Sequence, residues 1–119
     1  MGPSVTPVPL TAHANLWLQA NEQVVLSRWR VQLLEAIDAT GSIRMAAKRL
    51  KITYPLAWHR LDDMEKGLGL RLVERQRGGA RGGVAQLTAA GHDYVSRFNR
   101  FAAEVDAVIA QAFNAHFSL

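Results

Sequence analysis

The spacing of apolar positions changes several times along the chain, and each spacing predicts a different element. In segment 14–27, Leu16 and Leu18 alternate with Trp17 and Gln19, and the turn-forming pair Asn21-Glu22 leads to the apolar run 24–26, which predicts a β-hairpin. Segment 28–39 repeats its apolar residues every three or four positions, which predicts an amphipathic helix. Ser27 is a suitable N-cap for this helix, and Gly41 is expected to end it. Its buried stripe is expected to contain Trp29, Leu33, Ala36 and Ile37.

Two more helical patterns follow, separated by a tight turn. Ser42 can cap the short segment 43–50, where the alanine pair Ala46-Ala47 allows another helix to approach closely. Thr53 can cap segment 54–68, whose first turn tolerates a proline because its N–H groups lack helical partners. The buried face of this helix is predicted to hold Ala57, Leu61, Met64 and Leu68, and the opposite face Pro55, His59, Asp62 and Lys66.

The last part of the chain predicts a second hairpin and one long helix. Segments 71–76 and 84–88 are two short runs joined by a glycine-rich loop, which favours a hairpin. Thr88 can cap a helix that continues to about Phe117 and is about 40 Å long. Apolar residues recur in this helix at spacings of four and three, as in a seam that packs on another helix. They are Tyr94, Phe98, Phe101, Val105, Val108 and Ala112.

The order of these elements predicts a mainly α fold, a winged helix-turn-helix with short β-hairpins and a long C-terminal helix. We expect a flexible tail over residues 1–12, the winged helix-turn-helix domain over 13–88, and a dimerisation helix over 89–119. The seam of the last helix could also be an intramolecular core stripe. A dimer is favoured because so long a helix extends past a small domain and would otherwise expose large apolar residues.

Composition excludes several classes of function. The chain has 119 residues, enough for one domain with a modest core, and no cysteine, so disulfides, zinc–thiolate sites and thiol catalysis are excluded. Its four histidines have no metal-ligand spacing, and no nucleophile–base pair or acid dyad stands out, so we expect no metal, no cofactor and no enzymatic activity. Without a secretion signal or a membrane-length apolar run, a cytoplasmic location is expected.

Positive charge is concentrated in the middle of the sequence. The whole chain carries a net charge of +4, whereas the segment from Gly41 to Arg81 holds ten basic and four acidic residues. This segment therefore has a net charge of +6, and the flanking segments are slightly negative. Such clustering indicates a face that binds a polyanion, although a solvated charged surface is the plainer alternative.

The start of the third helix and the glycine-rich loop are the expected contact points with a nucleic acid. A helix N-terminus favours negative charge, glycines let the backbone come close to a duplex, and the arginines of the loop can neutralise phosphates. The candidate DNA-binding residues are Ser42, Arg44, Thr53, Tyr54, Pro55, His59, Arg60, Arg75, Arg77 and Arg81. For some of them a structural role is the alternative: Ser42 as a cap only, Tyr54 packed on the second helix, and Arg60 paired with an acid. Trp58 is expected to pack in the core rather than stack on DNA.

Segment 39–91 carries a combination of motifs found in known regulators. It holds Gly-Ser-Ile, Ala-Ala, Thr-Tyr-x-x-Ala-Trp, Asp-x-Met, and Leu-Val-Glu followed by paired glycines. In these features the chain resembles the N-terminal DNA-binding domain of ModE-type, molybdate-responsive bacterial regulators, from about Leu16 to Phe113. LysR-type regulators share the general pattern, including the Leu-Thr-x-x-Gly that opens the last helix.

This resemblance implies a transcriptional regulator that binds a palindromic site on double-stranded DNA as a homodimer, paired through the long helix. ModE-type regulators have a further oxyanion-binding portion, which the sequence to Leu119 does not contain. We therefore expect neither molybdate nor another small molecule to bind this chain, which is either a single-domain relative or a fragment. The alternative function is an architectural or adaptor protein that acts mainly through protein contacts of its C-terminal helix.

Overall fold

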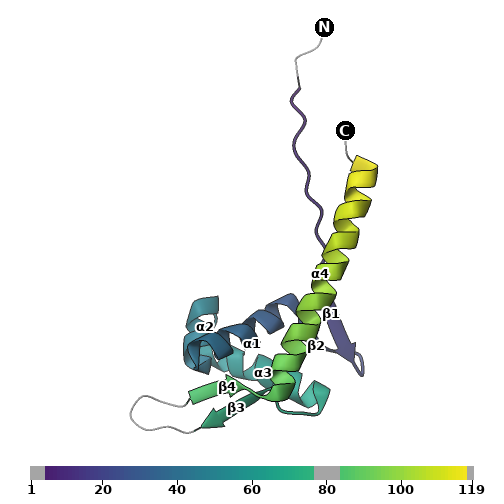
Figure 1. The fold of residues 1–119 in the computed structure, drawn as a ribbon. Helices are drawn as coiled ribbons and strands as arrows, with labels where there is room; N and C mark the ends of the chain where they lie inside the picture. The colour runs from purple at the N-terminus through teal and green to yellow at the C-terminus, as the bar shows by residue number, and fades with distance from the viewer. Residues whose placement is uncertain (1–4, 77–83, 118–119) are drawn as a thin grey trace.

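The computed structural model describes residues 5–76 and 84–117, which form four helices and two short antiparallel hairpins (Figure 1). The elements follow the predicted order, so the mainly α winged helix-turn-helix fold is confirmed. The bounds are β1 Trp17–Ala20, β2 Gln23–Ser27, α1 Arg28–Thr40, α2 Ile43–Leu50, α3 Tyr54–Leu68, β3 Val73–Gln76, β4 Val84–Leu87 and α4 Ala89–Phe117.

Local capping chemistry explains where the helices begin and end. Ser27, Ser42 and Thr53 have extended backbones, and their hydroxyl oxygens accept hydrogen bonds from the N–H groups of α1, α2 and α3. Thr88 does the same for α4, because its hydroxyl accepts from Gly91 N at 3.0 Å. Gly41 ends α1 in the left-handed conformation that glycine adopts without strain, as predicted.

Helices α1, α2 and α3 enclose the core, and α4 covers part of it with its first half. The fully buried side chains include Leu33, Leu34 and Ile37 of α1 and Leu61 and Met64 of α3. Ala46, Ala47 and Ala57 are also buried, so small residues allow α2 and α3 to pack closely, as the sequence predicts. Trp29 departs from the predicted stripe: at the first turn of α1 it is only partly buried.

The predicted buried face of α3 is largely confirmed, since Leu68 packs against the core from a partly buried position. The strand β3 begins at Val73 rather than at Arg71, because Arg71 and Leu72 belong to the turn that leads into it. The carbonyl of Leu72 accepts from Thr88 N at 2.9 Å, which ties this turn to the start of α4.

Helix α4 extends far beyond the rest of the domain. The chain measures 73 × 30 × 23 Å along its principal axes, and Figure 1 shows that α4 accounts for the long axis, with the N-terminal segment alongside it. The β3–β4 hairpin and α2 lie at the opposite end, next to α3 (Figure 1). The elements predicted to contact DNA and the second half of α4 therefore lie at opposite ends of the molecule (Figure 1).

Candidate nucleic-acid interface

The turn between α2 and α3 fixes the position of the third helix. Lys51 has a φ of 58° and ends α2 in the left-handed conformation, and its N–H donates to the carbonyl of Lys48 at 3.1 Å. Thr53 then caps α3 by accepting from Leu56 N at 3.3 Å, and Ser42 caps α2 by accepting from Met45 N at 3.1 Å. Both hydroxyl groups therefore have a capping role, which leaves a DNA contact by either residue as a prediction.

One face of α3 is open to solvent along its length. Pro55 and His59 are exposed, as are Asp62 and Lys66 two turns further on. The Lys66 ammonium lies 2.9 Å from an Asp62 carboxylate oxygen, and this hydrogen bond and charge raise the pKa of Lys66. The exposed face therefore presents an imidazole and a proline near the helix start, and a neutralised ion pair near its end.

Arg44 of α2 and Tyr54 of α3 form a stacked pair at the start of α3. The guanidinium carbon of Arg44 lies 4.3 Å from the centroid of the Tyr54 ring. The ring also packs against the core and meets Trp58 edge-on, with 6.2 Å between centroids. Tyr54 is thus partly buried, as in the packing alternative, whereas Arg44 is exposed with its charge available to a ligand.

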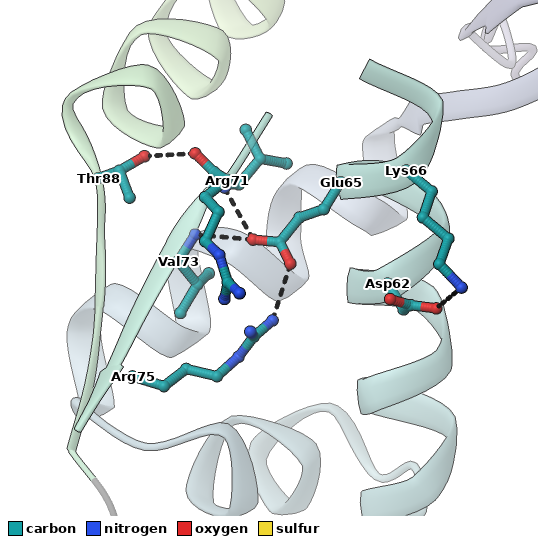
Figure 2. A network of polar contacts seen from close by, with 8 residues as sticks. Asp62, Glu65, Lys66, Arg71, Val73, Arg75 and Thr88 are labelled. Atoms are coloured by element: carbon teal, nitrogen blue, oxygen red, sulfur yellow. Dashed lines mark hydrogen bonds and ion pairs between the residues drawn. The ribbon is translucent and has the colours of Figure 1, made fainter. Parts of the chain in front are cut away.

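Arg60 and Arg75 are both occupied by acidic partners. Arg60 lies 2.5 Å from Asp63, one turn further along α3, which matches the ion-pair alternative for this residue. Arg75 reaches from β3 to Glu65 of α3, with its Nη2 donating to Oε1 at 2.8 Å (Figure 2). Neither guanidinium points freely into solvent. Arg77 and Arg81 lie outside the described residues, so their predicted DNA contacts remain predictions.

Trp58 packs against the core from a partly buried position, as expected, whereas Glu65 is a residue of this region that the sequence did not single out. Glu65 Oε2 accepts from the backbone N–H groups of Leu72 and Val73, at 2.8 and 3.2 Å, while Oε1 accepts from Arg75. The guanidinium of Arg75 lies 4.5 Å from the Trp58 ring centroid. The partners of Glu65 are at most ten residues away in sequence, but they lie outside α3. No local sequence motif therefore marks this carboxylate.

The predicted dimerisation seam divides along α4. Phe98 is buried in the core of its own chain, and Tyr94 packs against that core from a partly buried position. Phe101 is 41% exposed and Val108 is 63% exposed, while Val105 is partly buried and Ala112 is exposed. A groove of about 300 Å³ beside Phe101 is lined by Leu18 and Leu26 of the first hairpin and by Tyr94, Arg97 and Phe98 of α4.

The described part of the chain contains neither a cluster of metal-ligating side chains nor a membrane-spanning helix. Among residues 5–76 and 84–117, no three His, Asp or Glu side chains gather as metal ligands would. Over the same ranges, no helix has both the length and the apolar character that crossing a membrane requires.

Comparison with known proteins relates the chain to bacterial regulators. The family model described as "Bacterial regulatory helix-turn-helix protein, lysR family" matches residues 29–92, more than half of the chain. The molybdenum transport protein ModE of Azotobacter vinelandii is 35% identical over 96 residues, which are 81% of this chain and 36% of that protein. The transcriptional regulator ModE of Haemophilus influenzae is 38% identical over 73 residues, 61% of this chain and 29% of that protein.

The chain therefore spans about a third of the length of these curated relatives. Among solved structures, the CbnR_DBD–DNA complex is similar with a TM-score of 0.58 and 26% identity, covering 73% of this chain and 94% of that one. The likeness to this structure includes the winged helix-turn-helix arrangement of helices and hairpin described above.

Proposed function

The chain belongs to the LysR family of bacterial regulatory helix-turn-helix proteins, and we propose that it regulates transcription by binding double-stranded DNA in a sequence-specific manner. The observation that carries this proposal is the exposed face of α3. It starts at a well-capped helix N-terminus, and Arg44 stands beside it with a free positive charge. Such a helix can enter a major groove with its first turns.

Pro55 and His59 are the proposed base-edge contacts, since both lie on the exposed face of α3. Arg44 is a proposed phosphate contact, together with Arg77 and Arg81, which the sequence places between β3 and β4. Tyr54, Ser42, Thr53 and Arg60 are proposed to shape or support this surface, because each already has a partner within the protein.

A homodimer on a palindromic site is the second part of the proposal. The exposed apolar residues Phe101 and Val108 and the groove beside Leu18 offer apolar surface to a second copy. An isologous pair would present two α3 helices related by a two-fold axis, and a two-fold symmetric operator follows from that geometry. The curated relatives are named a molybdenum transport protein and a transcriptional regulator, but we propose no effector for this segment.

Selection of preferred duplexes from a random pool tests the proposed function. A two-fold symmetric sequence is the expected result, and a pool that shows no enrichment contradicts sequence-specific binding. Titration of a random duplex at several salt concentrations then distinguishes a transcriptional regulator from an adaptor protein. An adaptor would bind weakly and with little salt dependence, whereas each neutralised phosphate contributes a slope of about 0.9 to log K against log salt.

Variants assign the contacts within that experiment. Arg77→Ala and Arg81→Ala are expected to weaken binding to all sequences and to reduce the salt slope by about 1 each. His59→Ala is expected to change base preference at one position, at a cost of about 1–3 kcal/mol for the preferred site. Arg100→Ala, on an exposed part of α4, is the matched control and should change neither quantity.

A further inference from the structure

We propose that Glu65, Arg75 and Trp58 form a clamp that holds the β3–β4 hairpin at a fixed angle to α3, so that Arg75 positions the hairpin instead of binding a phosphate. The inference rests on the proposed function, because the effect of the clamp is measured as a change in DNA affinity. It assigns the only arginine of the glycine-rich region that the structure describes to a role inside the protein.

The carboxylate of Glu65 is the centre of the clamp. Its side chain is 12% exposed, and it accepts three hydrogen bonds from the start of the second hairpin and the turn before it: Leu72 N, Val73 N and Arg75 Nη2. Figure 2 shows Glu65 facing the strand from α3, with both carboxylate oxygens engaged. This carboxylate holds the Arg75 guanidinium toward α3, and hydrogen bonds between charged groups are stronger than neutral ones.

Trp58 holds the other side of the Arg75 guanidinium. The ring centroid lies 4.5 Å from the guanidinium carbon, and the Arg75 side chain is 24% exposed. A planar cation between an aromatic face and a carboxylate has its position and its orientation fixed together. Trp58 and Glu65 both belong to α3, two turns apart, so the pair attaches β3 to the same helix that is proposed to enter the groove.

The opposite side of the same turn is fixed as well. Thr88 donates its hydroxyl proton to the carbonyl of Arg71 at 2.8 Å, and its N–H donates to the carbonyl of Leu72 (Figure 2). The start of β3 is therefore held by α3 through Glu65 and by the start of α4 through Thr88. The clamp completes this arrangement at Arg75, two residues further along the hairpin.

The clamp and a phosphate contact predict opposite effects for the loss of the Glu65 charge. If Arg75 binds phosphate, Glu65→Gln releases it and removes a negative charge, so DNA binding becomes tighter. If Arg75 is a positioning residue, Glu65→Gln loosens the hairpin, and binding becomes weaker although the protein is more positive. Asp62→Asn is the matched control, since it removes a negative charge from the exposed face of the same helix without touching the clamp.

The test measures binding of a labelled random-sequence duplex to wild type, Glu65→Gln, Arg75→Gln, their double variant and Asp62→Asn over a range of salt. We expect Asp62→Asn to tighten binding, and both clamp variants to weaken it about fivefold to tenfold without adding in the double variant. The salt slope of Arg75→Gln should equal that of wild type. A slope lower by about 0.9, or tighter binding by Glu65→Gln, overturns the proposal.

Arg75→Lys keeps the test decisive if Glu65→Gln fails to fold. Lysine retains the charge but not the planar fork that stacks and pairs. The clamp predicts that Arg75→Lys weakens binding nearly as much as Arg75→Gln, whereas a phosphate contact predicts near-wild-type affinity for Arg75→Lys. The second result overturns the proposal.

A measurement without DNA separates this inference from the proposed function. Hydrogen exchange of the Leu72 and Val73 amides should be accelerated at least about tenfold in Arg75→Gln and in Glu65→Gln, because both groups lose part of their support. If the wild type binds no DNA, the proposed function fails and this arm alone decides the clamp. Unchanged exchange at both amides overturns it.

Discussion

The two halves of α4 carry the same spacing of apolar residues but have different surroundings. In the first half, Phe98 and Ala102 are 3% and 7% exposed because they pack into the core of their own chain. In the second half, Val108 and Phe117 are 63% and 61% exposed. A heptad pattern thus identifies a helix face that packs, but it does not identify the partner, which in the first half is the chain itself.

This difference gives each half its own expected sensitivity to mutation. Substitutions in the first half should lower the free energy of unfolding of the domain, whereas substitutions in the second half should lower the affinity between two copies. Replacing Phe98 in order to disrupt a dimer would therefore confuse the two effects. Val108 in the second half, and Phe101, which is 41% exposed although it lies in the first half, are the appropriate positions for that purpose.

Phe98→Ala should have the largest effect on the free energy of unfolding. Removing a buried phenyl ring leaves a cavity in a close-packed core, which costs about 3–5 kcal/mol. Chemical denaturation at several protein concentrations measures this loss and separates it from association. Val108→Ala is the matched control in the second half, and a similar loss in both variants would contradict the distinction between the halves.

Phe101→Glu combined with Val108→Glu should have the next largest effect, on association. Two carboxylates in an apolar contact between copies should weaken dimerisation at least about 100-fold, or about 2.7 kcal/mol, with little change in the melting temperature. Sedimentation velocity measures the dimer fraction. Ala103→Glu with Ala107→Glu adds the same charge to other exposed positions of α4 and should leave the dimer intact. Dimers that survive the first pair of substitutions place the interface elsewhere.

Gly91→Ala tests how closely the beginning of α4 packs on the second hairpin. A Cβ at this position would lie 2.2 Å from the carbonyl oxygen of Leu72 and 3.2 Å from Leu87 Cβ. Because the closer atom is backbone, the helix or the turn must move, which should cost about 1–3 kcal/mol. At an open helix position the same change would stabilise the protein by up to about 1 kcal/mol. A lower melting temperature therefore supports close packing at Gly91, and a higher one contradicts it.

The sequence predicted the elements well because their boundaries depend on neighbouring residues. Ser27, Ser42 and Thr53 cap their helices through N–H groups only three residues away, and such short-range chemistry is visible in the sequence. Trp29 was placed in the core by its periodicity, but a residue in the first turn of a helix can lie at the edge of the domain even when its spacing is right.

The roles of individual site residues could be predicted much less completely. Arg75 and Arg44 are both arginines beside an aromatic residue of α3, and composition gives them the same interpretation. They differ because Glu65 reaches Arg75 once the hairpin docks on α3, and no rule of spacing encodes that docking. The same reason explains why Phe98 and Phe101, three residues apart on one helix, differ in burial.

Arg28→Gln should have the smallest effect and probes the boundary between the two halves of α4. Arg28 at the start of α1 forms two hydrogen bonds with Asp106, at 2.8 and 3.3 Å, just beyond the buried half of the helix. Both side chains are substantially exposed, so water and salt screen the pair and its loss should cost at most about 1 kcal/mol. A double-mutant cycle with Asp106→Asn measures the coupling, which should shrink as salt is added. A coupling well above 1 kcal/mol would mean that the ion pair contributes substantially to holding α4 on the domain. The part of α4 attached to the domain would then extend as far as Asp106.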